Sequence, residues 1–129
     1  MRELLVLLLI GIVLVVKPLA VWAVEKEPVR HVVVFKYKQG ATEEQIRQVT
    51  NAFRDLKNTI PGIVSFEYGV NSSPEAKNHG FTHVYLLTFV DAKARDTYLP
   101  HPEHKKFGAL LAKLGILEDV FVIDYAPKN

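Results

Sequence analysis

The sequence contains no cysteine, so disulfides cannot stabilise the folded protein. It also contains no internal repeat and no low-complexity tract. Positive and negative side chains nearly balance, at a formal net charge of +2, and they form no basic stripe. The sequence therefore gives no electrostatic basis for binding nucleic acid. With 129 residues the chain is long enough for one domain, whose stability must come from its core or from oligomerisation.

The apolar N-terminus has the pattern of a secretory signal peptide. Arg2 precedes an uninterrupted apolar run over residues 4–16, and residues 21–23 offer a small-residue cleavage site. The run is about 13 residues long, short of the roughly 18 to 20 that span a bilayer. We therefore expect a signal peptide over residues 1–23, cleaved after Ala23, and a periplasmic or secreted protein with no membrane partner after cleavage. An uncleaved membrane anchor is the alternative.

Hydrophobic periodicity and turn residues place one domain over residues 29–127, after a linker over residues 24–28. A capping-box pattern from Thr42 to Gln45 begins the first long helix. His101 is expected to cap the second long helix. We expect strands over residues 29–38, 63–70, 81–90 and 117–125, long helices over 43–60 and 102–114, and a short helix over 92–99.

This order of elements predicts an α+β, ferredoxin-like βαββαβ fold, with a four-stranded antiparallel sheet and both long helices on one face. The first, third and last strands are apolar on both of their faces. An uncovered sheet face of this kind would exceed the apolar patches that soluble monomers tolerate. We therefore expect a homodimer whose two sheets form a dimeric α/β barrel. A charge at Val84 or Val122 should disrupt that dimer.

A tyrosine and two histidines gather between residues 98 and 104. Pro100 ends the short helix, and the second long helix begins directly after His101. His104 comes three residues before Phe107 on the apolar stripe of that helix, so its side chain should point inward. An inward imidazole near Tyr98 needs a hydrogen-bond partner or a chemical role. Tyr98 and His104 are therefore the first candidates for a functional site.

Four segments together resemble the stress-responsive dimeric α/β-barrel (Dabb) family. They are residues 30–36, residues 80–84, Tyr98 with residues 101–104, and residues 123–125. The resemblance implies the same dimeric barrel that the apolar strand faces predict. Most members are small stress-associated proteins of plants and bacteria without an assigned reaction. A few are enzymes, including a cyclase branch that makes olivetolic acid.

The resemblance to the cyclase branch implies a cavity between the sheet and the helices, with a Tyr–His catalytic pair and further lining histidines. An exported chain would not meet the cytosolic substrate of the plant enzyme, so the substrate does not carry over. Carried over residue by residue, the catalytic pair is Tyr98 and His104, and His31 and His83 are lining residues. We expect His31 and His83 to bind the ligand together with Phe35 and Phe107.

The same stretch also has plainer interpretations. Tyr98 and His104 can form a hydrogen-bonded pair that only fixes the junction between the helices. His101 and His104 have a spacing that a metal site permits, with Glu103 nearby, but the sequence places no third ligand there. We therefore expect neither a metal nor a cofactor.

Charged and flexible residues elsewhere are expected to be peripheral. Glu67 and Asp124 are expected to be solvated charges or charges at a sheet edge. The loop over residues 71–80, which contains His79, could cover the cavity.

Two functions follow from these patterns. The first is an exported, dimeric protein that binds a small, partly apolar ligand or has a protective role, without a reaction. The second is a cofactor-independent cyclase or lyase, in which His104 is the general base and Tyr98 the electrophilic partner. An open cavity that reaches both side chains would favour the enzyme, and a tight junction would favour a structural role.

Overall fold

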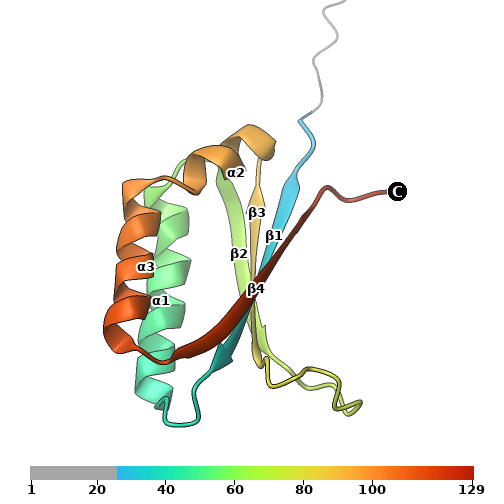
Figure 1. Cartoon of the computed structure of the whole chain (residues 1–129). Coiled ribbons are helices and arrows are strands. Elements are labelled where there is room, and N and C mark those ends of the chain that lie inside the picture. Colours follow the sequence, from blue (N-terminus) through green and yellow to red (C-terminus); the bar gives the residue numbers. More distant parts are fainter. Residues whose placement is uncertain (1–25) are drawn as a thin grey trace, which may run out of the picture.

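A computed structural model describes residues 26–129 and shows a four-stranded antiparallel sheet with two long helices on one face (Figure 1). The expected signal peptide over residues 1–23 lies outside the described residues. The strand order is β2-β3-β1-β4, so the fold is the predicted ferredoxin-like βαββαβ arrangement. The elements are β1 (Val29–Tyr37), α1 (Glu43–Thr59), β2 (Ile63–Val70), β3 (His83–Phe89), α2 (Ala92–Tyr98), α3 (Pro102–Leu114) and β4 (Leu117–Tyr125).

Local side-chain chemistry fixes where the two long helices begin and end. The Thr42 hydroxyl accepts a hydrogen bond from the Gln45 backbone N–H, and the Gln45 side chain accepts one from the Thr42 N–H. At the start of α3, His101 is the N-cap, and Pro102 takes the first helical position. Gly115 ends α3 in the left-handed region, at φ 62°. The predicted ends of these helices are thereby confirmed.

The core is an aromatic cluster between the sheet and the paired helices α1 and α3. Phe53 of α1 lies at its centre and is 1% exposed. Its ring stacks on Phe107 of α3, with 4.5 Å between centroids, and lies 5.1 Å from Tyr85 of β3. Phe35 of β1 and Phe66 of β2 complete the cluster, at 6.2 and 5.6 Å from Phe53. Side chains from five elements thus fix the helices against the sheet.

No helix among residues 26–129 covers the other face of the sheet (Figure 1). Large apolar side chains lie exposed on it, including Val84 at 36%, Phe121 at 41% and Ile123 at 54%. The sequence placed Val122 on this face too, but Val122 alternates with Phe121 and Ile123 and instead lines a cavity on the helix side. The expectation that a charge at Val122 disrupts a dimer is therefore wrong, because Val122 lies on the helix side of the sheet and not on the uncovered face.

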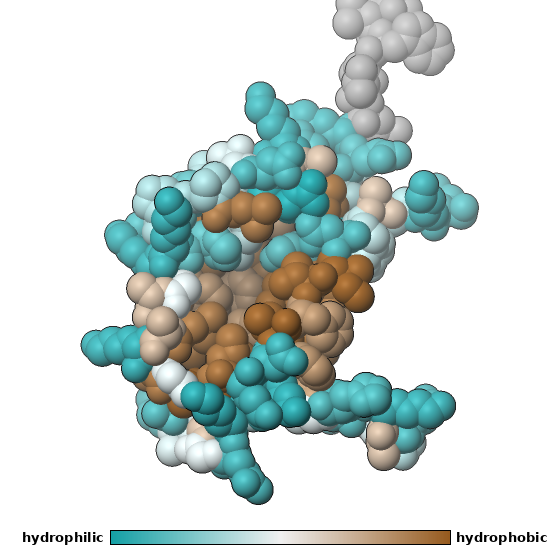
Figure 2. All heavy atoms as spheres, in the orientation of Figure 1, coloured by the Kyte–Doolittle hydropathy of each residue, from teal (hydrophilic) through white to brown (hydrophobic). Residues whose placement is uncertain are grey.

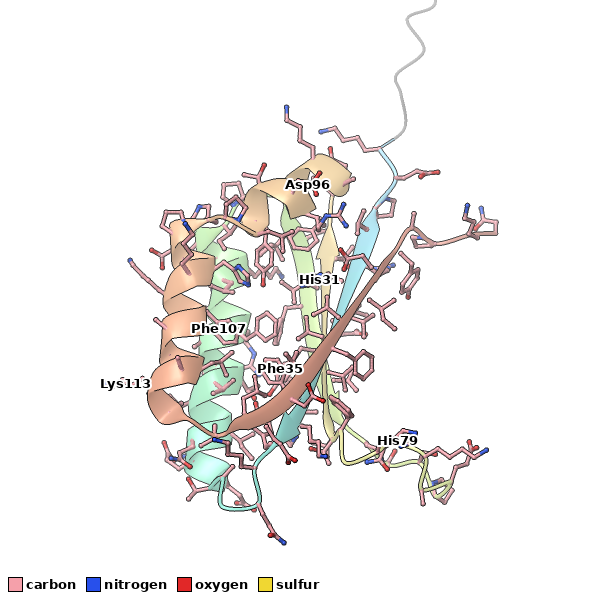
Figure 3. The ribbon with its side chains drawn as sticks, viewed as in Figure 1. His31, Phe35, His79, Asp96, Phe107 and Lys113 are labelled. Carbon is pink, nitrogen blue, oxygen red and sulfur yellow. The ribbon has the colours of Figure 1, made fainter. Side chains whose placement is uncertain are left out.

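The loop between β2 and β3 extends from the end of the sheet, away from the helices (Figure 1). His79 within it lies far from the helix-covered face (Figure 3). The expectation that this loop covers a cavity between sheet and helices is therefore wrong.

Within residues 26–129, no helix is long and apolar enough to cross a membrane.

Candidate functional site

A cavity of about 240 Å³ lies between the sheet and α3. His31 and Phe35 of β1 point across this space toward Phe107 of α3 (Figure 3). Seen from the direction of Figure 1, hydrophobic residues gather in the middle of the molecule and are surrounded by hydrophilic ones (Figure 2). Three polar side chains enter the otherwise apolar lining: His31, Tyr98 and His104. The structure therefore brings together five of the six sequence-predicted site residues, and His83 is the exception.

Tyr98 is the last residue of α2, and its side chain is fully buried. Its hydroxyl oxygen has no hydrogen-bond partner among residues 26–129. Burial raises the pKa of this phenol, and the negative charge of Asp124 raises it further. Tyr98 consequently keeps its proton at neutral pH and offers an unused donor beside the cavity.

His104 lies in the first turn of α3, with its ring centroid 4.3 Å from that of Tyr98. Its Nδ1 lies 2.9 Å from the backbone oxygen of Leu99. Because a carbonyl only accepts, Nδ1 carries a proton and is the donor of this hydrogen bond, so Nε2 is the ring nitrogen that this bond leaves unused. No hydrogen bond joins His104 to Tyr98, so the expectation of a mutually satisfied pair is wrong.

His31 is 5% exposed and belongs to a chain of charged and polar groups. Its Nδ1 donates to Oδ1 of Asp124 at 2.6 Å, and Oδ2 of Asp124 accepts from Nη1 of Arg95 at 2.6 Å. Burial lowers the pKa of His31, and the hydrogen bond and charge of Asp124 partly oppose that shift. Asp124 and Arg95 thereby fix the orientation of the His31 ring and leave Nε2 as its unprotonated nitrogen.

Asp124 is exposed on the edge strand β4, as expected, but the sequence analysis missed its hydrogen bond to His31. Its antiparallel neighbour on β1 is His31. Asp124 also shares a strand face with Val120 and Val122, both of which line the cavity. The sequence did contain a signal for this role, because Asp124 continues an otherwise apolar face of the last strand. Recognising His31 as its partner, however, requires knowing that β4 pairs with β1.

His83 does not belong to this cavity, contrary to the expectation from the sequence. It pairs with Phe35 in the register of β1 and β3, whereas His31 pairs with Leu87. The two histidines are thus four strand positions apart, or roughly 13 Å at about 3.3 Å per residue. The His83 ring packs on Tyr37, with 4.9 Å between centroids, and burial lowers its pKa.

The remaining charged candidates take no part in the cavity. His101 uses Nδ1 to accept a hydrogen bond from the Glu103 backbone N–H at 3.1 Å, as its N-cap role requires. Glu67 is exposed on β2. The part of the chain that the structure describes contains no group of three or more histidine or acidic side chains arranged to hold a metal ion.

Replacing Asp124 with asparagine is expected to lower the pKa of His31 further. The substitution removes the negative charge that stabilises the imidazolium but leaves the ring buried. NMR titration of the His31 Cε1–H signal measures the change. Asp119→Asn, an equal change of charge elsewhere on β4, is the control and should leave the pKa of His31 as it is. An unchanged or higher value in Asp124→Asn would contradict the assigned role of Asp124.

Comparisons with known proteins agree with this architecture. The model of the stress responsive A/B barrel domain matches residues 29–127. The stress-response A/B barrel domain-containing protein HS1 of Arabidopsis thaliana is 35% identical over 104 residues, which cover 81% of this chain and 94% of that protein. Olivetolic acid cyclase of Cannabis sativa is 29% identical over 101 residues, which cover 78% of this chain and 98% of that protein.

Two solved structures are similar as well. Hydroxynitrile lyase from Passiflora edulis gives a TM-score of 0.71 at 27% identity, covering 79% of this chain and 94% of that one. A dimeric protein of unknown function with a ferredoxin-like fold, from Bacteroides fragilis, gives a TM-score of 0.60 at 26% identity, covering 79% and 98%. The match of the family model, together with the HS1 relative, shows that this chain belongs to the stress responsive A/B barrel domain family.

Proposed function

We propose that this protein is an exported homodimer that binds a small, partly apolar molecule in the cavity beneath α3, through an oxygen atom that accepts a hydrogen bond. The observation that carries the proposal is the buried hydroxyl of Tyr98, which has no partner among residues 26–129. A buried polar group without a partner costs about 1–3 kcal/mol. A ligand oxygen that accepts from Tyr98 offsets that cost, whereas a purely apolar ligand does not.

The size and lining of the cavity support a small ligand. The cavity measures about 240 Å³, whereas sites for drug-sized molecules usually measure about 300–1,000 Å³. Its walls are aromatic and aliphatic, and the imidazoles of His31 and His104 are the other polar groups in the lining. A ring or short chain that carries one carbonyl or hydroxyl group matches this arrangement.

The homodimer part of the proposal rests on the uncovered sheet face. Exposed Val84, Phe121 and Ile123 would be removed from water if a second copy packed there. The similar Bacteroides fragilis protein, which has the same fold, is dimeric. Export rests on the apolar run over residues 4–16 and the cleavage pattern that ends at Ala23.

A second candidate function is a cofactor-independent cyclase or lyase, favoured by the free Nε2 position of His104. Its Nδ1 is committed to the Leu99 carbonyl, so Nε2 is the nitrogen that can accept a proton. His104 would take a proton from the carbon next to a carbonyl, and Tyr98 would stabilise the enolate oxygen. Two similar proteins are enzymes, olivetolic acid cyclase and hydroxynitrile lyase.

Acetophenone and ethylbenzene test the role of Tyr98, because they share a shape and differ in one carbonyl oxygen. Acetophenone is expected to bind more tightly, and Tyr98→Phe should weaken its binding by about 5- to 30-fold, the equivalent of about 1–2 kcal/mol. Calorimetry on protein from cells that express the whole chain measures both. Tyr125→Phe, which removes a hydroxyl from an exposed tyrosine, is the control. Equal binding of the two compounds would refute the proposal.

The same compound separates the two functions. If the protein is an enzyme of the second kind, it should accelerate deuterium exchange at the acetophenone methyl group in D₂O, and His104→Ala should abolish that acceleration while the variant stays folded. If the protein only binds ligands, exchange should stay at the rate in buffer. A loss of about 1–3 kcal/mol of stability in His104→Ala, without any exchange in the parent, would instead indicate a structural role.

A further inference from the structure

A second hollow lies at the opposite edge of the sheet, between α1 and β2. We call it the α1–β2 groove, and it measures about 530 Å³. Its walls carry Arg47, Thr50 and Arg54 from α1, Tyr68 and Val70 from β2, and His83 from β3. It shares none of these side chains with the cavity that contains Tyr98. The groove is thus a separate feature, which the proposed function leaves unused.

Arg54 is held in place in this groove without a carboxylate partner. One guanidinium nitrogen, Nη1, donates to Oδ1 of Asn51 at 2.8 Å. The central carbon of the guanidinium lies 5.3 Å from the ring centroid of Tyr68 and 5.8 Å from that of Phe66. Arg47 and Arg95, by contrast, pair with acidic side chains, and within residues 26–129 Arg54 forms no ion pair. Its remaining donors are preorganised for an anion from outside the chain.

The tyrosines beneath the groove add no negative charge to the surroundings of Arg54, and the acidic side chains nearby are Glu43 and Glu44. Tyr85 joins Tyr37 and Thr50 through hydroxyl hydrogen bonds of 2.9 and 2.8 Å, beneath the groove. Burial raises the pKa of both tyrosines, so neither ionises at neutral pH. Glu43 is the acidic side chain in the groove lining, and Glu44 beside it pairs with Arg47. The two arginines are thus matched in number by two carboxylates, and Arg54 is the arginine of the groove lining that forms no ion pair within residues 26–129.

We propose that the α1–β2 groove binds a small organic carboxylate. The guanidinium edge of Arg54 receives the carboxylate, because its fork of N–H groups matches the two oxygens in a way that a point charge does not. Ile46 and Val70, on opposite sides of the groove, contact the apolar body of the ligand. The hydroxyl of Thr50 and the imidazole of His83 lie along the same surface.

Hexanoate and its neutral amide, hexanamide, are suitable probes, since they differ in charge and hardly in shape. Hexanoate titrated into ¹⁵N-labelled protein, from cells that express the whole chain, should shift the Arg54 Nε–H signal and the backbone signals of Asn51 and Val70. Arg54→Gln should weaken hexanoate binding about tenfold, which is the effect of about 1.4 kcal/mol. Hexanamide should bind no more tightly to the parent than hexanoate binds to Arg54→Gln.

Lys57→Gln is the matched control, because it removes one positive charge from an exposed residue of α1 that does not line the groove. It should leave the hexanoate affinity within twofold of the parent value. Equal weakening by Arg54→Gln and Lys57→Gln would reduce the effect to net charge and overturn the proposal. Shifts confined to the residues around Tyr98 would overturn it as well, and would leave the proposed function intact. Unchanged thermal unfolding of Arg54→Gln shows that the fold is retained, since the side chain is exposed.

Discussion

Replacing Phe53 with alanine should lower the free energy of unfolding by about 3–5 kcal/mol, which is the usual cost of removing a buried phenylalanine. Phe53 is 1% exposed, and its ring contacts four other aromatic side chains. The substitution would leave a void that joins the cavity beneath α3, because Phe53 lines that cavity too. Urea unfolding at a fixed protein concentration measures the loss.

Phe66→Ala is the matched control for this prediction. It removes the same atoms from the same aromatic cluster, but Phe66 is only partly buried, on the edge strand β2. The loss of unfolding free energy in Phe66→Ala should therefore be less than half of the loss in Phe53→Ala. If the two variants lost equal stability, Phe53 would not be the centre of the core.

Replacing Val84 with glutamate should convert the dimer into a monomer or an aggregate. Val84 lies on the sheet face that the helices leave uncovered, and it is flanked there by Leu86 and Phe121. A carboxylate without a partner in an apolar interface costs several kcal/mol in each subunit, and twofold symmetry would introduce two such charges. Sedimentation equilibrium compares the mass of the variant with that of the parent.

Val122→Glu is the control for the dimer prediction, since it makes the same chemical change one position along β4 from Phe121. Val122 faces the cavity and is 51% exposed, so a carboxylate there can stay hydrated. The variant should keep the mass of the parent and bind acetophenone less well. A parent protein that sediments as a single subunit at high concentration would exclude the dimer altogether.

Local signals in the sequence predicted the fold closely. Thr42 and Gln45 set the start of α1, and His101 with Gly115 set the two ends of α3. Each of these effects depends on residues within one turn of each other, so no knowledge of tertiary structure is needed. The alternation along β1 likewise puts His31 and Phe35 on one face of the strand, and in the structure that face is the helix side of the sheet.

The errors arose where strand register decides which side chains meet. His31 and His83 lie on neighbouring strands and share a face, yet the register places Leu87 opposite His31. The hydrogen bond of Asp124 to His31 was missed, because the sequence of β4 does not reveal which histidine lies across from it. Periodicity determines the face of a sheet on which a side chain lies, but not its position relative to the next strand.

The hydrogen bond between His31 and Asp124 connects the first strand with the last, across 93 residues of sequence. During translation His31 therefore lacks Asp124 until 93 further residues have been synthesised. Contacts of such separation also form slowly, because a long segment must close before they are made. C-terminal truncation within β4, a strand that is mostly exposed, would remove the carboxylate and leave Phe53 and its neighbours in place. The synthesis and pairing of β4, rather than formation of the core, thus decide when His31 acquires its partner.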